Sequence, residues 1–232
     1  MLTTVLVLAT IQFWTAQFQP GYISQLGVYH GGQWKAQSGD DWLAMIPTAK
    51  GFELVDTTVY AEHAVDEMFD EPGQMSGIRV STPSWTHPTY LFQGLATLRP
   101  GVVPTLYNGF HPLAPSQSLI LKNPYPDVEL YRLSATGNRE GNVLFKNYTL
   151  HLDYRQNGHS TVTQELVFYE QLSEEAYPRL LWAGDLDGDN KLDLIMDITY
   201  HYNVQHLVLY LSSYAAAGEL VRLAAELKTS GC

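Results

Sequence analysis

Alternating apolar and polar positions predict a β-hairpin over residues 147–170. Apolar side chains recur at nearly every second position from 147 to 155 and again from 160 to 170, which is typical of strands with one buried face. These side chains are Tyr148, Leu150, Leu152, Tyr154, Val162, Leu166 and Phe168. Between the two runs, Asn157-Gly158 favours the positive φ angles of a type I′ turn.

Further strands are predicted on both sides of this hairpin. Residues 42–46 and 52–61 are rich in β-forming side chains and flank a turn at 47–51, and residues 207–211 form another apolar run. Between them, proline recurs often enough to exclude long helices and to limit strands to short or edge pieces. The prolines are Pro83, Pro88, Pro100, Pro104, Pro112, Pro115, Pro124 and Pro126.

Two segments allow more than one interpretation. Residues 62–71 are strongly acidic and end at Pro72-Gly73, so they fit either a short helix or a solvated loop. Residues 218–228 carry Leu220, Leu223 and Leu227 at helical spacing, but an extended strand fits them equally well.

These patterns predict a mainly β fold of compact antiparallel sheets, arranged as a sandwich or a partial propeller, with little helix. No repeat of 20–50 residues is apparent. We expect one β-rich domain over residues 17–232, and a shift of composition near 124–127 would also permit a two-part organisation.

Residues 1–16 form an apolar run, MLTTVLVLATIQFWTA, that is too short to cross a bilayer. Its length predicts a signal peptide, although no Lys or Arg precedes it and Trp14 is bulky for a cleavage site. A buried first strand is the alternative. No other segment is long and apolar enough to cross a bilayer, so we expect no integral membrane span. With a signal peptide at 1–16, we expect a secreted or periplasmic protein.

The charge of the chain excludes some partners. Thirteen Lys and Arg against 24 Asp and Glu give a net charge of −11 among 232 residues, which repels nucleic-acid phosphates and anionic lipid surfaces. Nucleic acid is therefore not an expected partner. The single cysteine, Cys232, excludes an intrachain disulfide.

One segment carries explicit metal chemistry. Asp185, Asp187, Asp189 and Asp193 occupy positions 1, 3, 5 and 9 of a loop that Gly188 allows to bend sharply. Carboxylate oxygens, with the main-chain carbonyl of Lys191 as a fifth ligand, suit Ca²⁺ because this cation accepts several oxygens at flexible geometry. The loop has no Cys or His, so soft metals are not expected there.

The surroundings of this loop differ from those of an EF-hand. The sixth and twelfth positions hold Asn190 and Met196 in place of Gly and Glu. Downstream, an alternating apolar face predicts a strand running to residue 202, so the loop would join β to β. That face comprises Leu192, Leu194, Met196, Ile198, Tyr200 and Tyr202.

Residues 184–195, GDLDGDNKLDLI, resemble the calcium loop of FG-GAP and VCBS repeat proteins, the integrin-α-like modules. The resemblance implies side-chain ligation by Asp185, Asp187, Asp189 and Asp193 and main-chain ligation by Lys191. Those families repeat the loop from blade to blade, whereas this chain has it once, which argues against a full propeller.

Evidence for catalysis is weak in the sequence. Asp197 and His201 would share one strand face, but four strand residues span roughly 13 Å, too far for a direct dyad. Nucleophile elbows, phosphate loops and zinc spacings are absent. Converging carboxylates could support a glycosidase, and a set of tryptophans could stack on sugars. The candidates are Glu62, Asp66, Asp70 and Glu165, and Trp34, Trp42, Trp85 and Trp182.

The sequence therefore favours a secreted or periplasmic, calcium-binding, non-enzymatic β domain that binds a protein partner. The alternative is a calcium-supported carbohydrate-binding protein or a glycoside hydrolase.

Overall fold

The computed structural model describes residues 20–122, 129–141, 144–156, 162–173 and 176–230. The chain is mainly β, with 61% strand and 2% helix, which confirms the predicted fold class. Within the described part, no helix is both long and apolar enough to span a bilayer. The expected signal peptide at 1–16, the junction near 124–127, the Asn157-Gly158 turn and Cys232 lie outside the described residues.

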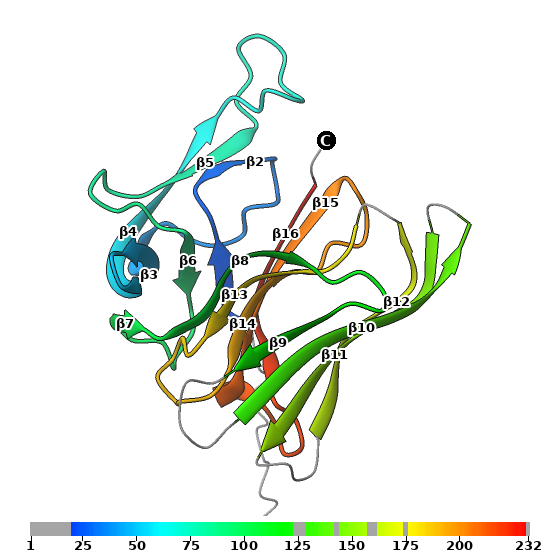
Figure 1. The fold of residues 1–232 in the computed structure, drawn as a ribbon. Coiled ribbons are helices and arrows are strands. Elements are labelled where there is room, and N and C mark those ends of the chain that lie inside the picture. Colours follow the sequence, from blue (N-terminus) through cyan, green and yellow to red (C-terminus); the bar gives the residue numbers. More distant parts are fainter. Residues whose placement is uncertain (1–19, 123–128, 142–143, 157–161, 174–175, 231–232) are drawn as a thin grey trace, which may run out of the picture.

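The strands fall into three antiparallel sheets (Figure 1). The seven-stranded sheet runs in the order β1-β6-β3-β4-β5-β2, with β7 paired to β4. Its strands are β1 (Tyr22–Ser24), β2 (Gly27–Tyr29), β3 (Gly39–Thr48), β4 (Gly51–Ala64), β5 (Gly77–Ser81), β6 (Tyr90–Gln93) and β7 (Gly101–Val103).

The other two sheets come from the second half of the chain. A five-stranded sheet has the order β16-β15-β14-β13-β8, and a four-stranded sheet has the order β12-β11-β10-β9. Their strands are β8 (Thr105–Pro112), β9 (Ser118–Lys122), β10 (Glu129–Glu140), β11 (Leu144–Gln156), β12 (Val162–Ser173), β13 (Arg179–Gly184), β14 (Asp193–Asp197), β15 (Val204–Leu211) and β16 (Arg222–Ser230). A single 3₁₀ turn, η1 (Ser212–Tyr214), follows β15 in the described chain.

The five-stranded sheet is the middle layer, because its two faces belong to different hydrophobic clusters. Leu194 and Met196 of β14 pack with the four-stranded sheet, whereas Ile195, between them, packs with the seven-stranded sheet. On β15, Val208 packs with the four-stranded sheet and Leu209 with the seven-stranded sheet. Alternate side chains of a strand point to opposite faces, so both faces of this sheet are buried.

The predicted hairpin is confirmed as β11 and β12, which pair from Leu144 to Tyr154. Residues 42–46 and 52–61 lie within β3 and β4, which also pair, and residues 207–211 lie within β15. Between residues 83 and 122 the strands have three to eight residues, as the prolines predicted.

The structure settles the conformation of the two segments that had more than one interpretation, residues 62–71 and 218–228. β4 continues to Ala64, and residues 65–76 form turns and loop, so the acidic segment contains no helix. Within residues 218–228, the chain becomes strand β16 from Arg222 onward. β16 pairs with β15, and this tertiary pairing overrides the helical spacing of the leucines.

The predicted strand from 192 to 202 was wrong in length and in pattern. β14 ends at Asp197, and all five of its residues are buried, so it has no exposed face. It ends there because the backbone N–H of Thr199 donates to Asp197 Oδ1 at 3.0 Å, which turns the chain. The Ile198 N–H then donates to the carbonyl of His206 across that turn, at 2.8 Å.

Candidate metal centre

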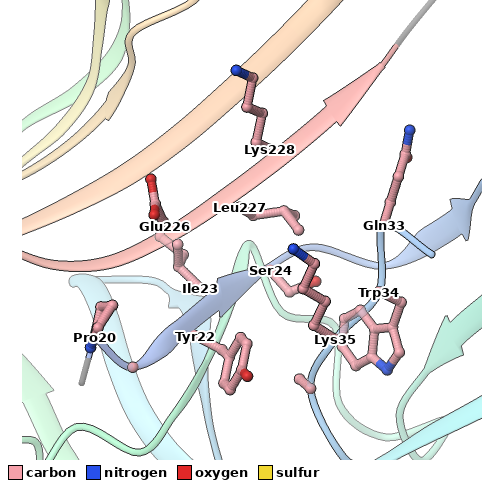
Figure 2. Close-up of a pocket in the computed structure, with 12 residues that line it drawn as sticks. Pro20, Tyr22, Ile23, Ser24, Gln33, Trp34, Lys35, Glu226, Leu227 and Lys228 are labelled. Carbon is pink, nitrogen blue, oxygen red and sulfur yellow. The ribbon is translucent and has the colours of Figure 1, made fainter.

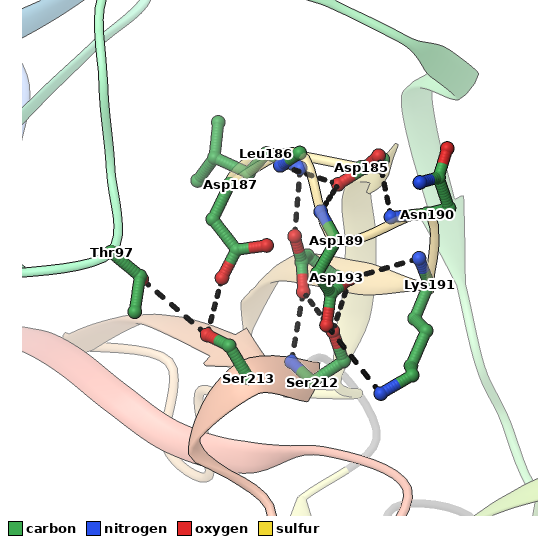
Figure 3. Close-up of polar contacts among 11 residues, drawn as sticks. Thr97, Asp185, Leu186, Asp187, Asp189, Asn190, Lys191, Asp193, Ser212 and Ser213 are labelled. Atoms are coloured by element: carbon green, nitrogen blue, oxygen red, sulfur yellow. Dashed lines mark hydrogen bonds and ion pairs between the residues drawn. The ribbon is translucent and has the colours of Figure 1, made fainter.

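The aspartate loop occupies residues 185–192 and joins β13 to β14 in the middle sheet (Figure 3). It therefore connects β to β, as predicted. Gly184 and Asp193 are paired where the loop begins and ends, so both ends are fixed by the sheet. A Cβ atom on Gly184 would lie 2.2 Å from the carbonyl oxygen of Pro104, which requires glycine at this close approach.

Asp185 organises the loop backbone. Its Oδ1 accepts hydrogen bonds from the backbone N–H groups of Gly188 at 2.7 Å and Asp189 at 3.1 Å, and its Oδ2 accepts one from Asn190 at 3.0 Å. Gly188 has φ of 80°, and Asn190 has φ of 63°, which asparagine tolerates better than most residues. The bend predicted at Gly188 is therefore present, and Asn190 adds a second positive φ.

Three of the four predicted aspartate ligands converge. Asp185, Asp187 and Asp193 each offer one carboxylate oxygen, and these oxygens lie within 4.8 Å of one another. Asp187 Oδ1 is buried and has no hydrogen-bond partner among the described residues. A buried acceptor without a donor is costly, and a cation at this point would satisfy it.

Asp193 is the most deeply buried member of the cluster, with 0% exposure. Its Oδ2 accepts a hydrogen bond of 2.7 Å from the Leu186 N–H, and its Oδ1 accepts one of 2.8 Å from the Ser212 N–H. Burial raises the pKa of Asp193 well above its usual range, and the nearby charge of Asp187 raises it further. Burial is also the main cause of the raised pKa of Asp185.

Asp189 takes a different position from the other three. Both of its carboxylate oxygens accept hydrogen bonds from Ser212 Oγ, at 3.0 and 2.9 Å, and Oδ1 also accepts one from the Lys191 N–H. It is not part of the converging cluster of three. Ligation by Asp189 and by the Lys191 carbonyl therefore stays a prediction.

Two serines at this site were not predicted from the sequence. Ser212 donates to Asp189 and Asp193, and Ser213 Oγ makes a short hydrogen bond to Asp187 Oδ2. Ser213 also lies 3.4 Å from Thr97 Oγ1, which belongs to the connection between β6 and β7 (Figure 3). Loop spacing could not reveal these residues, because they come from the turn after β15, at least 19 residues away in sequence.

This donor set fits a hard cation. Three carboxylates with oxygens this close repel one another by roughly 3 kcal/mol per pair at an effective dielectric constant near 20. A divalent cation replaces that repulsion with attraction, and oxygen ligands on a flexible loop suit Ca²⁺.

The other predicted candidates have structural contacts. Asp197 accepts hydrogen bonds from Thr199 and lies 3.5 Å from Arg179, whereas His201 contacts Asn203, so no Asp197–His201 dyad forms. The four acidic candidates also fail to converge. Glu62, Asp66 and Asp70 belong to β4 and the loop after it, whereas Glu165 lies on β12 in the opposite outer layer.

Two of the predicted sugar-stacking tryptophans are core residues. Trp42 and Trp182 are 1% and 0% exposed, so neither can contact a ligand. Both side chains point to buried faces of their strands, as most large apolar side chains do. Trp85 is 66% exposed, and Trp34 is half-buried at the edge of a cavity.

Comparison with known proteins gave no relative of this chain. No protein family, curated protein or solved structure was found that matches it. The FG-GAP and VCBS resemblance of residues 184–195 therefore stays a prediction.

Proposed function

We propose that this protein is a secreted or periplasmic calcium-binding β domain with a non-enzymatic role in binding another protein. The observation that carries the calcium proposal is the convergence of Asp185, Asp187 and Asp193, one of which buries an oxygen without a hydrogen-bond partner. The resemblance of the loop to FG-GAP and VCBS loops supports the same ion and the same aspartates.

The ion would have a structural role. Hydrogen bonds connect the aspartate loop to Ser212 and Ser213 after β15 and, through Ser213, to Thr97. Thr97 belongs to the outer seven-stranded layer, and the serines to the middle layer. An ion held by the loop would thus stiffen the junction between two layers of the fold.

A non-enzymatic role agrees with the contacts of the remaining polar groups. The buried Asp197 accepts a hydrogen bond from the Thr199 hydroxyl, and the partly buried His201 contacts Asn203, so the two residues are engaged with different neighbours. The carboxylates considered for glycoside hydrolysis are divided between two outer layers. The remaining polar contacts favour recognition over catalysis.

The best surface for a protein partner is the loop after β4. Val65, Met68, Phe69 and Met75 are each 44–66% exposed there, which is unusual for side chains of this size so close together in sequence. Figure 1 shows this loop projecting beyond β4 and β5. Glu67, Asp70 and Glu71 stand among these side chains, so a partner with an apolar centre and a basic rim would fit.

Thermal unfolding with calcium or with EDTA tests the ion. At free calcium one hundred times the dissociation constant, binding stabilises the folded chain by about 2.7 kcal/mol, so Tm should rise by roughly 5–10 °C. The double variant Asp187→Ala/Asp189→Ala should lose this rise, whereas Asp56→Ala, at an exposed position of β4, should keep it. An unchanged melting curve at millimolar calcium would refute the site.

Affinity capture tests the partner. The purified chain should retain a specific protein from an extract of its source, and less of it in EDTA. Phe69→Ser should abolish capture while lowering Tm only slightly, because this side chain is 66% exposed and loses only an edge contact with the His30 ring. Val102→Ser, at a 79% exposed position of β7, is the matched control and should capture normally. Equal capture by both variants would exclude the loop after β4 as the binding surface.

A further inference from the structure

A cavity of about 440 Å³ lies between β1, β16 and residues 33–36 and shares no residue with the aspartate loop (Figure 2). Its volume is within the range of small-ligand sites, roughly 300–1,000 Å³. The walls include Tyr22, Trp34, Lys35, Glu226, Leu227 and Lys228.

The cavity exists because two sheet edges meet and then separate. β1 is the edge of the seven-stranded sheet, and β16 is the edge of the five-stranded sheet. They touch at one end, where the Gly21 N–H donates to the Ala224 carbonyl at 2.8 Å. Farther along β16, Gln33 Nε2 donates to Ser230 Oγ at 2.5 Å. These two hydrogen bonds join the walls of the cavity at two points.

Trp34 supplies a rigid aromatic wall. Its indole stacks on that of Trp42, with ring centroids 5.7 Å apart and an interplanar angle of 14°. Trp42 is buried, and its Nε1 donates to the Gln37 carbonyl at 2.9 Å, so the base of this stack is fixed. A ligand ring that packs against Trp34 would therefore lose little free energy to side-chain ordering.

The charge of the cavity is opposite to that of the whole chain. Glu226 is paired with His206 at 2.8 Å, and Lys228 Nζ donates to the Tyr200 hydroxyl at 2.9 Å and lies 4.7 Å from the centre of its ring. Lys35 is exposed and has no acidic partner among the described residues. Figure 2 shows its side chain among the residues that line the cavity. An anionic group would be attracted to this point.

We propose that this cavity binds an acidic saccharide, with a hexuronate ring against Trp34 and its carboxylate at Lys35. A sugar acid combines a ring with weakly polar faces, several hydroxyl groups and one negative charge, and the cavity offers an aromatic wall, polar side chains and the ammonium group of Lys35. Phosphate ligands fit less well, because the described residues around the cavity include neither a glycine-rich loop nor a helix N-terminus to cradle them. The site needs no calcium.

Isothermal titration of the full chain with tetragalacturonate in EDTA tests this proposal. We expect saturable binding that is at least tenfold weaker for Trp34→Ala and for Lys35→Gln. Trp85→Ala and Lys50→Gln, which change exposed side chains elsewhere, should bind like the unmodified chain. Because Lys35 is exposed, Lys35→Gln tests the site even if Trp34→Ala perturbs the fold.

Three results would overturn the proposal. They are absence of binding to tetragalacturonate, equal binding of the neutral cellotetraose, and unchanged affinity of Lys35→Gln. Asp187→Asn should bind tetragalacturonate normally in EDTA, because the cavity and the loop share no residue. Loss of binding in this variant would also contradict a separate site. Since calcium is absent throughout, failure of the calcium proposal leaves this test intact.

Discussion

The backbone N–H of Ser212 donates a hydrogen bond of 2.8 Å to Asp193 Oδ1, which ties the first residue of β14 to the residue after β15. Ser212 Oγ adds bonds to the same oxygen and to both oxygens of Asp189. One serine therefore positions two carboxylates of the loop. The cluster is held in place by the sheet as well as by the loop.

Ser212→Ala removes the hydroxyl but keeps the backbone bond. We expect the free energy of unfolding to fall by about 1–2 kcal/mol, because hydrogen bonds to charged acceptors are lost at a buried position. Urea denaturation measures this change. Ser213→Ala, which removes a more exposed hydroxyl, should cost less, and the reverse order would show that Ser212 does not organise the site.

Asp187→Asn should have opposite effects with and without calcium. In EDTA it removes one negative charge that raises the pKa values of Asp193 and Asp185, so the variant should be at least as stable as the unmodified chain. With saturating calcium the unmodified chain should become more stable by about 2–3 kcal/mol, because only it binds the ion well. Urea denaturation under both conditions measures these stabilities, with Asp56→Asn as control. The prediction would be contradicted if the same protein were the more stable one both in EDTA and in calcium.

Two glycines near the loop should respond differently to alanine. Gly184→Ala places a Cβ 2.2 Å from the Pro104 carbonyl oxygen, so the two segments must separate at a cost of about 3 kcal/mol. Gly188→Ala meets no atom within 4 Å and costs about 1 kcal/mol through its positive φ alone. Comparable losses of stability in urea would show that the 2.2 Å approach does not control this junction.

Asp153 should make the stability of the four-stranded sheet depend on acid pH. Burial alone would raise its pKa, but hydrogen bonds from Thr163 and Arg132 and the charge of Arg132 outweigh that effect and lower the pKa. Because the folded pKa lies below the unfolded value of about 3.9, this contribution is present above that pH and is lost as pH falls through the folded pKa.

The measurement is the urea midpoint between pH 5 and pH 3. The unmodified chain should lose stability over this window, and Asp153→Asn should lose less, because it lacks the titrating group. Glu67→Gln, in the loop after β4, serves as the charge-matched control. Parallel slopes for Asp153→Asn and the unmodified chain would exclude the Arg132 pair as a source of pH dependence.

Local patterns in the sequence were sufficient to predict the strands that have one buried face. β11 and β12 alternate clearly, and turn residues separate them, so their pairing followed directly. β14 differs because it is buried on both faces, and alternation carries no information there. The three-layer arrangement could not be predicted for the same reason, since periodicity does not identify what packs against each face.

The candidate site was likewise predictable only in part from the sequence. The spacing of the aspartates and Gly188 predicted a bend that gathers carboxylates, because those contacts lie within nine residues. Ser212, Ser213 and Thr97 join the site only through sheet pairing and layer packing, which no local pattern encodes. The orientation of Asp189 toward Ser212 depends on the same long-range contacts.

Terbium luminescence tests directly whether the aspartate loop binds a cation. Trp182 is buried in β13, two residues before Gly184, close enough to transfer its excitation to an ion bound among the aspartates. Excitation of tryptophan should give saturable terbium emission that calcium displaces and that Asp187→Asn abolishes, while Asp56→Asn retains it. No sensitised emission from the unmodified chain, or equal emission from Asp187→Asn, would contradict an ion at Asp185, Asp187 and Asp193.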